Sequence, residues 1–501
     1  MTPSAGKESV GNAFWHMFAA ITIFVFLFGL TIPLLGPDEP RYAQVAREMF
    51  ERGDWVTPTL GGFDWFEKPA LLYWLQIASY HIFGVNEFAA RFGSAIFGLG
   101  TIFCLYIFGT NMSEYGELRF RFAKWLALIA ATSIGLIVFS RGASFDIILT
   151  FPIAASLTAF FVFDERERSG RSGTLPLALF YIFVGVAVLA KGLVGIVFPY
   201  AIVSFYYLLS WRRPSAKLLL SVLWGTLLAA LVASAWYVPM YQQNGWKFID
   251  EFFIQHHFQR YTSNKYFHPQ PFHFFFWVLP LMTIPWLPFF FMALWRIGKN
   301  ILQTLRRSDR RLSASPATIF CCAWIIVPLV FFSFSGSKLP GYILPALPPC
   351  IILAAGAAYR WINDLPARAS AVRGIAVATF VVIIAVLIFI VPQFADGDSV
   401  KRLIAEAHAR GFDNERLAML HRVSHNAEFY APGRIIRTED GKQHKYLGAM
   451  ELVDVVKQNG PILVLVPIEY RKELVETAPL ATEPIADNGE FVLARVTLHQ
   501  Q

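Results

Sequence analysis

The chain has little charge for its length. Only 16% of its 501 residues are charged and 55% are hydrophobic, whereas ordinary soluble domains carry about 25% charged residues. Many of its apolar runs approach the roughly 20 residues needed to cross a bilayer, which excludes a soluble globular protein. The net charge of +8 would suit a nucleic-acid partner, but the basic residues concentrate in short loops between apolar runs, where they set membrane orientation. We therefore predict a polytopic α-helical membrane protein with no nucleic-acid partner.

Cysteine is also scarce, with four residues in the whole chain. All four lie within apolar runs and have no metal-ligand spacing, so neither a disulfide framework nor a cysteine metal site is expected. The first apolar run, residues 14–35, is too long for a typical signal-peptide core and ends in GPDEP. It is therefore predicted to be a retained span.

Hydropathy gives about eleven candidate spans. They cover residues 14–35, 88–110, 121–140, 144–163, 175–190, 192–210, 218–239, 272–294, 317–334, 341–359 and 372–392. Residues 69–83 are apolar but short, which predicts an interfacial or re-entrant helix. With a cytoplasmic N-terminus, the loops rich in Lys and Arg all face the cytoplasm, as the positive-inside rule requires. The 36–91 stretch, the 240–271 loop and the C-terminus then lie outside the cytoplasm.

The composition changes near residue 393 to that of a soluble module. We predict a transmembrane catalytic domain over residues 1–392 and a small periplasmic α/β domain over 393–501. Within the second, residues 401–412 and 468–479 have helical patterns, and the apolar runs 461–468 and 490–498 are typical of buried strands.

The 36–91 stretch is the candidate active site. Its ionisable residues gather at its two ends, beginning with Asp38 and Glu39 in GPDEPRY and ending with Glu67 and Lys68 in FEKP. Carboxylates beside a lipid-accessible surface are costly unless they are paired, solvated or used. Asp38 has two compatible interpretations: a carboxylate that caps or begins a helix, and a functional carboxylate that faces a cleft. Lys68 could pair with Glu67 or bind the phosphate of a lipid-linked substrate.

Three further segments carry candidate residues. Asp146 lies early in a span, about one turn beyond Arg141, so it is either half of a structural ion pair or a functional carboxylate. The 240–271 loop contains His256, His257 and Arg260; the two histidines are either polar contacts or, with Glu67, ligands of a divalent metal. The segment SGSKLPGYILPALPP places Lys338 and Tyr342 at an external turn, as a helix boundary or as donors to an anionic headgroup.

Several motifs carry a family resemblance. GPDEPRYAQVAREMFERGDW, FDWFEKPALLYWL and FGVNEFAARF resemble the N-terminal signature of membrane glycosyltransferases that use polyprenyl-phosphate sugars. That family includes the protein O-mannosyltransferases and the lipid A aminoarabinose transferases. HHFQRY, HPQPFHFF and SGSKLPGYILPALPP are similar to the aminoarabinose branch. The resemblance implies a GT-C fold, a transmembrane bundle with juxtamembrane helices and a C-terminal periplasmic domain.

The resemblance also implies residue roles. Asp38 and Asp146 match catalytic positions. The lipid-phosphate contacts of the family match Lys68, Arg260 and Tyr342, and we add Glu39 and Lys338 as further substrate-binding residues. A metal site matches Glu67 with His256 or His257. Two features depart from the aminoarabinose branch. His256 stands where that branch commonly has Glu, and the membrane part has about eleven spans, fewer than is typical there.

The sequence thus predicts an enzyme that moves a sugar, 4-amino-4-deoxy-L-arabinose, from undecaprenyl phosphate to lipid A at the periplasmic face of the inner membrane. No nucleotide cofactor is expected. The alternative is transfer of another sugar, galacturonate or mannose, to lipopolysaccharide core or protein. A lipid-linked sugar transporter is less favoured, because its polar residues would lie near mid-membrane, whereas here they gather at one external face.

Overall fold

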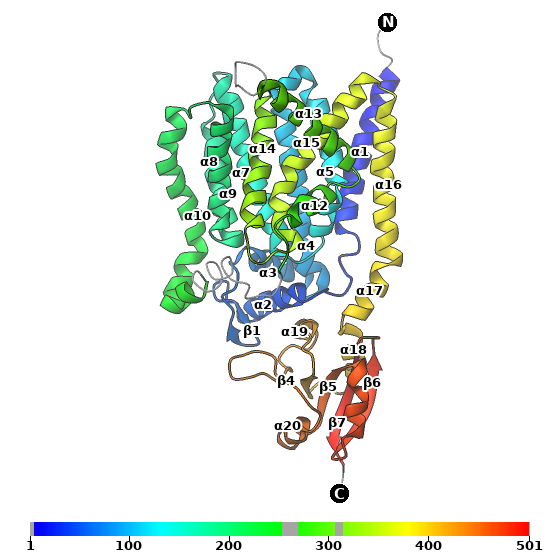
Figure 1. Ribbon diagram of the computed structural model, residues 1–501. Helices are drawn as coiled ribbons and strands as arrows, with labels where there is room; N and C mark the ends of the chain where they lie inside the picture. Colours follow the sequence, from blue (N-terminus) through cyan, green and yellow to red (C-terminus); the bar gives the residue numbers. More distant parts are fainter. Residues whose placement is uncertain (1–4, 253–268, 306–313, 500–501) are drawn as a thin grey trace. The chain divides into compact units, whose positions relative to one another are not determined.

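The computed structural model describes residues 5–252, 269–305 and 314–499, which divide into two compact units (Figure 1). The membrane unit comprises the described residues up to Phe28 together with Phe66–Leu72 and Phe92–Ile384. The sheet unit comprises Gly29–Trp65, Tyr73–Arg91 and the described residues from Ala385 onward. The stretch that precedes the second predicted span is thus shared between the two units, and most of it belongs with the C-terminal segment. We describe each unit separately.

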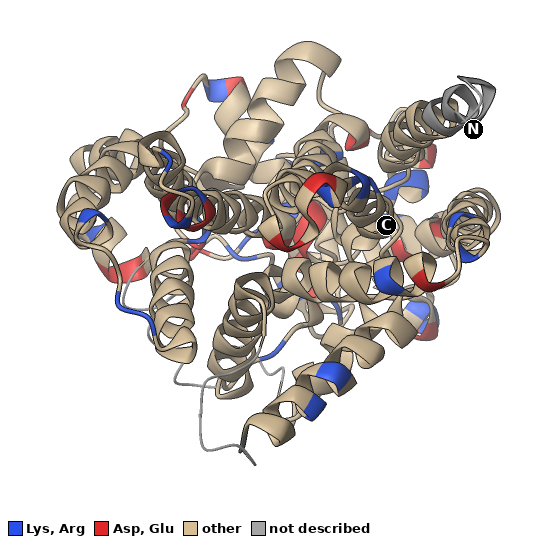
Figure 2. Ribbon diagram, turned by 90° about the horizontal axis from the view of Figure 1, so that it is seen from above, with Lys and Arg blue, Asp and Glu red and all other residues tan. Residues whose placement is uncertain are grey.

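The membrane unit is helical. Its elements are α1 (Ala5–Leu27), the larger part of α4 (Glu87–Thr110), η1 (Ser113–Leu118), α5 (Arg119–Ala131), α6 (Ile134–Phe139), α7 (Phe145–Arg168), α8 (Thr174–Lys191), α9 (Val194–Ser210), α10 (Ala216–Ile249), α12 (Phe274–Leu281), α13 (Leu287–Leu305), α14 (Pro316–Ser333), η3 (Pro340–Ala346), α15 (Leu347–Asp364) and α16 (Arg368–Phe389). Viewed along the bundle, most of the ribbon carries no charged residue (Figure 2).

In the described part of the chain, seven helical segments are long and apolar enough to cross a membrane: α4, α7, α8, α10, α14, η3 with α15, and α16. Residues 13–27 of α1 and the whole of α9 form shorter apolar helices. The chain is therefore a multi-pass membrane protein. The first span was predicted to end at residue 35, and this end was wrong. α1 stops at Leu27, and the chain turns at Gly29, whose φ is 71°.

The two remaining predicted spans, 121–140 and 272–294, are interrupted helices. The first breaks between α5 and α6, and the second between α12 and α13. Backbone groups at the two breaks form hydrogen bonds with each other. The amide of Ile134 donates to the carbonyl of Ile284 at 2.8 Å, and the amide of Gly135 donates to the carbonyl of Met282 at 2.9 Å. Non-helical backbone at membrane depth is tolerated where protein buries it in this way.

Two elements form the centre of the membrane unit. In α7 and in η3 with α15, 89% and 94% of the apolar window is buried, against 22% for α10 and 17% for α16. α7 packs against α8, α9 and η3, and α15 packs against α5, α13 and α14. Phe320 of α14 stacks on Phe160 of α7 at a centroid distance of 5.7 Å. α10 and α16 therefore present most of their surface to lipid.

The sheet unit contains a mixed five-stranded sheet of order β4-β3-β5-β7-β6. β3 is parallel to β4 and β5, whereas β7 is antiparallel to β5 and β6. Its elements are α2 (Asp38–Arg52), β1 (Thr59–Leu60), β2 (Phe63–Asp64), most of α3 (Leu71–Phe83), α17 (Val391–Asp398), α18 (Lys401–Ala409), β3 (Arg416–Leu420), α19 (Asn426–Tyr430), β4 (Lys445–Tyr446), α20 (Glu451–Asn459), β5 (Ile462–Pro467), η4 (Ile468–Tyr470), α21 (Arg471–Glu476), β6 (Leu480–Asp487) and β7 (Phe491–Leu498).

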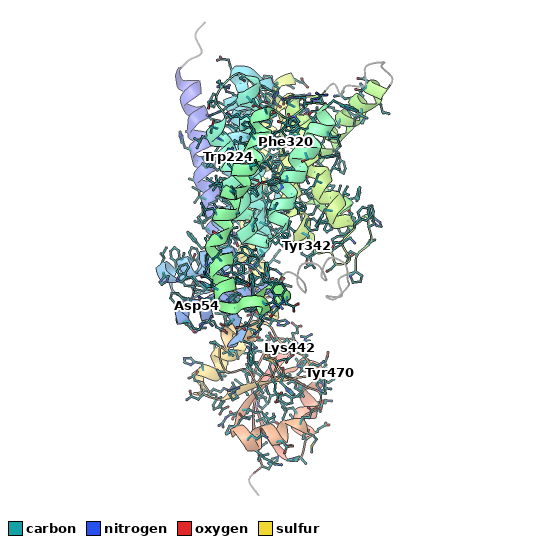
Figure 3. All side chains as sticks on the ribbon, turned by 90° about the vertical axis from the view of Figure 1, so that its left-hand side faces the viewer. Asp54, Trp224, Phe320, Tyr342, Lys442 and Tyr470 are labelled. Atoms are coloured by element: carbon teal, nitrogen blue, oxygen red, sulfur yellow. The ribbon has the colours of Figure 1, made fainter. Side chains whose placement is uncertain are left out.

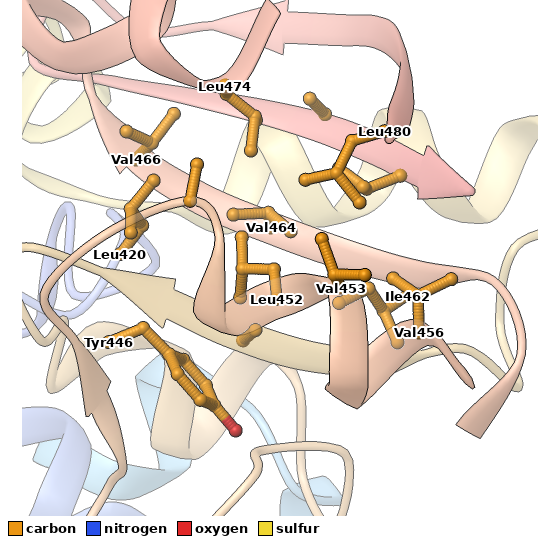
Figure 4. Close-up of a cluster of buried hydrophobic side chains, with 14 of the residues drawn as sticks. Leu420, Tyr446, Leu452, Val453, Val456, Ile462, Val464, Val466, Leu474 and Leu480 are labelled. Carbon is orange, nitrogen blue, oxygen red and sulfur yellow. The ribbon is translucent and has the colours of Figure 1, made fainter. Parts of the chain in front are cut away.

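The local predictions for this segment are confirmed at α18, β5, α21 and β7. β5 alternates between the two faces of the sheet. Ile462, Val464 and Val466 join one core with side chains of α20 and α21 (Figure 4). Leu463 and Leu465 join the other core with side chains of α18 and α19. A strand covered on both faces is apolar at every position, which explains the unbroken hydrophobic run of β5.

Candidate active site

A buried ion pair fixes the segment that leads into α2. Arg91 is 1% exposed and donates to both carboxylate oxygens of Glu39, at 3.0 and 2.5 Å. The same guanidinium donates to the carbonyls of Leu30, Ile32 and Pro33. Glu39 also accepts from the amide of Leu35 at 2.8 Å. Glu39 therefore holds the chain in place at the start of α2, and its predicted contact with substrate stays a prediction.

Asp38 is the first residue of α2, one position beyond the N-cap, Pro37. Its carboxylate accepts from the guanidinium of Arg41 at 2.5 Å, and its side chain is 47% exposed. A carboxylate in the first turn is favoured by the helix dipole, and this one combines that position with access to solvent. Both interpretations of Asp38, helix-terminal and functional, fit this geometry.

The C-terminal segment packs on the same part of α2. α19 packs against α2, and Tyr430 at its end accepts from the amide of Leu34 at 2.8 Å. Asp398 accepts from the amide of Gly36 at 2.7 Å. His425, the residue before α19, lies beside Asp38 and Arg41. Burial, and to a smaller extent the Arg41 guanidinium, lower the pKa of His425 to about 4, whereas the Asp38 carboxylate acts to raise it.

This histidine predicts a pH dependence of stability. A folded-state pKa near 4, below the unfolded value near 6.5, means that the unfolded chain binds more protons between these two pH values, so stability falls as the pH is lowered through 6.5. At pH 5 the loss should be roughly 1–2 kcal/mol. We expect the melting temperature of the wild type to fall more than that of His425→Gln between pH 7.5 and 5. Equal pH profiles for the two proteins would show that His425 is not buried in its neutral form.

In the membrane unit, the EKP motif carries a shielded ion pair. Lys68 lies 2.6 Å from Glu67, and the two side chains are only 9% and 10% exposed. The preceding Phe66 is fully buried and packs against Phe248, with Lys247 above its ring at 5.7 Å. The ion pair thus directly follows a buried aromatic residue in the sequence. The Glu67–Lys68 pairing considered from the sequence is present, and a phosphate contact stays a prediction for Lys68.

A second charged cluster joins three elements of the membrane unit. Asp146 lies in the first turn of α7, where the hydroxyl of Ser144 accepts from its amide. The Asp146 carboxylate pairs with Lys191, the last residue of α8, at 2.7 Å, and the Lys191 ammonium lies 5.0 Å from the ring centroid of Tyr342 in η3. Figure 3 places Tyr342 near one end of the bundle, far along its axis from Phe320. The predicted Asp146 and Tyr342 are therefore neighbours, and Lys191 links them.

The Asp146 carboxylate approaches the backbone closely at Gly341, where there is no space for a side chain. A Cβ at this position would overlap the carboxylate of Asp146 and the ring of Phe139. We expect Gly341→Ala to displace the Asp146 carboxylate, to cost about 1–3 kcal/mol and to reduce activity. Gly374→Ala is the matched control, because a Cβ there meets open space in α16. Equal activity and melting temperature in both variants would show that the position of Asp146 is unimportant.

Lys338 is buried at the turn between α14 and η3. Its ammonium donates to the carbonyls of Ser335 at 2.7 Å and Gln270 at 3.0 Å, and burial lowers the pKa of Lys338. These bonds tie residue 270 to the turn. Lys338 thus has a structural role, and its contact with an anionic headgroup stays a prediction.

The predicted Arg260, His256 and His257 lie outside the described residues. Among the residues that the structure describes, no group of three His, Cys, Asp or Glu side chains could hold a metal ion. Glu67, the third predicted ligand, already accepts from an ammonium, whose positive charge disfavours a cation at the same carboxylate. The metal site stays a prediction, and no chemical step is assigned to it.

Comparison with known proteins shows what this chain is similar to. Residues 32–253 match the family described as dolichyl-phosphate-mannose-protein mannosyltransferase. The undecaprenyl phosphate-α-4-amino-4-deoxy-L-arabinose arabinosyl transferases of Shewanella sediminis and Aeromonas salmonicida are 30% and 31% identical over 67% and 70% of this chain. These matches agree with the predicted resemblance to membrane glycosyltransferases. It spans 58% and 61% of the length of those two relatives.

Solved structures confirm the GT-C fold. The crystal structure of ArnT from Cupriavidus metallidurans bound to undecaprenyl phosphate matches with a TM-score of 0.75 at 22% identity, over 98% of each chain. The oligosaccharyltransferase AglB from Archaeoglobus fulgidus matches with a TM-score of 0.53 at 13% identity, over 98% of this chain and 74% of that one. The predicted GT-C fold and the predicted resemblance to the aminoarabinose transferases are therefore confirmed.

Sequence reasoning missed two residues of the candidate site in this GT-C chain. Lys191 is a single cation at the end of an apolar helix, and the following Gly192, at φ 67°, marks the point where the helix ends. That combination could have singled it out. His425 had no such signal, since nothing in the sequence near it predicts that α19 packs against α2.

Proposed function

We propose that this chain transfers 4-amino-4-deoxy-L-arabinose from undecaprenyl phosphate to lipid A. The observation that carries the proposal is the Asp146–Lys191 pair beside Tyr342, at helix ends of a membrane unit. A carboxylate and an ammonium held there suit a cationic amino sugar and an anionic lipid phosphate respectively. The names of the curated relatives support the same sugar and the same carrier lipid.

The donor already contains its leaving group, a lipid phosphate. The protein therefore chiefly has to hold the donor and neutralise the charge that develops on the phosphate as the glycosidic bond breaks. We assign this task to Lys68, Arg260 and Tyr342, with Lys191 as a further cation. Lys68 and Lys191 are each held in an ion pair before the reaction, and donors that are preorganised in this way are effective.

The role of Asp38 depends on the acceptor. A hydroxyl acceptor has to lose its proton, and Asp38 would accept it as a general base, which is worth about 10²–10⁴ in rate. A lipid A phosphate is already anionic and needs little deprotonation. Asp38 would then orient the acceptor or contact the cationic sugar amine.

The alternative within the same reaction class is another polyprenyl-phosphate sugar, galacturonate or mannose, moved to lipopolysaccharide core or protein. The match to the mannosyltransferase family favours this alternative over unrelated chemistry. In either case we place the reaction at the periplasmic face of the inner membrane, because the basic loops predict a cytoplasmic location for the opposite ends of the spans.

The test is the intact mass of lipid A from cells with and without the protein. A pentosamine increment that requires the protein and disappears with Lys68→Ala is the expected result. An increment of another sugar mass would keep the mechanism and replace the donor. Lipid A of unchanged mass would overturn the assignment of the acceptor and direct the same measurement to lipopolysaccharide core and glycoproteins.

A further inference from the structure

A groove of about 570 Å³ lies between α8, α9 and α10. Five aromatic residues line it, Phe180, Tyr181, Tyr200, Tyr207 and Trp211, and it continues to the α9–α10 linker. The α8 residues of the groove, Phe180 and Tyr181, lie in the N-terminal half of α8, whereas Lys191, which α8 contributes to the candidate active site, is its last residue. It is therefore separate from that site.

The groove is positively charged. Arg212 and Arg213 line it, and none of its lining residues is acidic. Arg212 is fixed in place: it pairs with the fully buried Asp164 at 3.2 Å and lies 5.9 Å from the ring centroid of Tyr207. The side chain of Arg213 is exposed. One guanidinium is thus preorganised and the next is accessible, which suits a phosphate group.

The charge extends beyond the two arginines. The segments 164–171 and 211–217, which adjoin the groove, contain six basic and three acidic residues: Arg166, Arg168, Arg171, Arg212, Arg213 and Lys217 against Asp164, Glu165 and Glu167. Asp164 and Glu165 are themselves bound by Arg168. An anion that reaches this end of the helices therefore meets a net positive field.

An apolar track leads away from the groove along α10. Leu219 lines the groove and is 57% exposed, and Leu223, Leu227 and Leu231 follow it at 75%, 72% and 69% exposure. Residues four apart lie on one face of a helix, so these leucines form one continuous stripe. Trp211, 77% exposed, stands beside the groove, in a position typical of aromatic residues at headgroup depth.

We propose that this groove binds an anionic glycerophospholipid, with its phosphate at Arg212 and Arg213 and an acyl chain along the leucine stripe of α10. Charge complementarity and the adjoining lipid-exposed stripe both favour this occupant. Basic pockets between transmembrane helices bind anionic headgroups in the same way. The inference goes beyond the proposed transferase activity and does not depend on it.

The experiment is native mass spectrometry of the full-length protein in detergent, titrated with phosphatidylglycerol and, separately, with phosphatidylcholine. We expect phosphatidylglycerol to bind at least about fivefold more tightly. Arg213→Gln removes the accessible guanidinium, and Ser204→Trp fills the groove at an exposed position that lines it. Each should reduce that preference about fivefold. Lys217→Gln is the matched control, because Lys217 is an exposed cation in the first turn of α10 but does not line the groove.

Three results would overturn the proposal. Equal affinities of the wild type for the two phospholipids would exclude selection for a headgroup of net negative charge. An equal loss in Lys217→Gln and Arg213→Gln would indicate a diffuse basic surface. If undecaprenyl phosphate competes with phosphatidylglycerol at the same affinity, the groove has a different occupant. The same conclusion follows if the protein is a dimer that Ser204→Trp dissociates without any effect on lipid binding.

Discussion

Asp38→Asn is expected to lower the rate of sugar transfer to a hydroxyl acceptor by about 10²–10⁴-fold. Asn has the same shape as Asp but cannot accept the proton of the attacking group. The change should cost little stability, since the Asp38–Arg41 pair is partly exposed and such pairs contribute about 0–1 kcal/mol. The measurement is kcat and KM of the purified protein with an undecaprenyl-phosphate-linked donor. With a phosphate acceptor, the loss should appear in KM more than in kcat, because Asp38 would then only position the acceptor.

Glu51→Gln is the matched control for this experiment. Glu51 is an acidic residue of the same helix, 53% exposed and paired with Arg47. Its replacement should leave both kinetic constants unchanged. An Asp38→Asn protein that transfers sugar at the wild-type rate with both kinds of acceptor would mean that the catalytic carboxylate is elsewhere, with Asp146 as the next candidate.

Arg91→Met is expected to reduce the free energy of unfolding by about 3–5 kcal/mol. Arg91 is buried, and its guanidinium bonds to the Glu39 carboxylate and to three backbone carbonyls of residues 30–33. Its loss leaves a carboxylate and these carbonyls without that donor. The measurement is chemical denaturation of the detergent-solubilised protein, followed by a probe in the sheet unit.

The double variant Glu39→Gln/Arg91→Met separates the two contributions. It should be more stable than Arg91→Met alone, because no unpaired charge remains in the protein interior. Lys457→Met is the control for loss of a surface ion pair: Lys457 and Asp454 are 58% and 76% exposed, and the cost should stay below about 1 kcal/mol. An Arg91→Met protein as stable as Lys457→Met would show that the buried pair does not hold the segment before α2.

Much of the fold could be predicted from the sequence, because the properties that decide it are local. A helix that crosses lipid has to be long and apolar, so each predicted span overlaps a helix or an interrupted helix, although the first predicted span ends too late. β5 is apolar at every position because both its faces are covered, and it was predicted for that reason. β4 and β6 were missed: β4 has only two residues, and β6 contains Pro484 and exposed polar positions typical of an edge strand.

The sequence predicted individual residues of the candidate site but not the contacts between them. GPDEP and FEKP indicated Asp38 and Lys68, since charges next to apolar spans are conspicuous in the sequence. The long-range ion pairs were not predictable: Asp146 meets a lysine 45 residues away, and Glu39 meets an arginine 52 residues away. Such pairings depend on which helix ends come together, and hydropathy carries no information about that.

The sequence by itself therefore determined which segments enter the membrane, which form the C-terminal sheet and which charged residues have to be accounted for. The tertiary structure decided how those charges are used. It turned Glu39 into an anchor for the start of α2, joined Asp146 to Lys191 and Tyr342, and placed His425 beside Asp38. The physical reason is that burial and ion pairing depend on the whole packed chain, whereas hydropathy and helix length are properties of each segment alone.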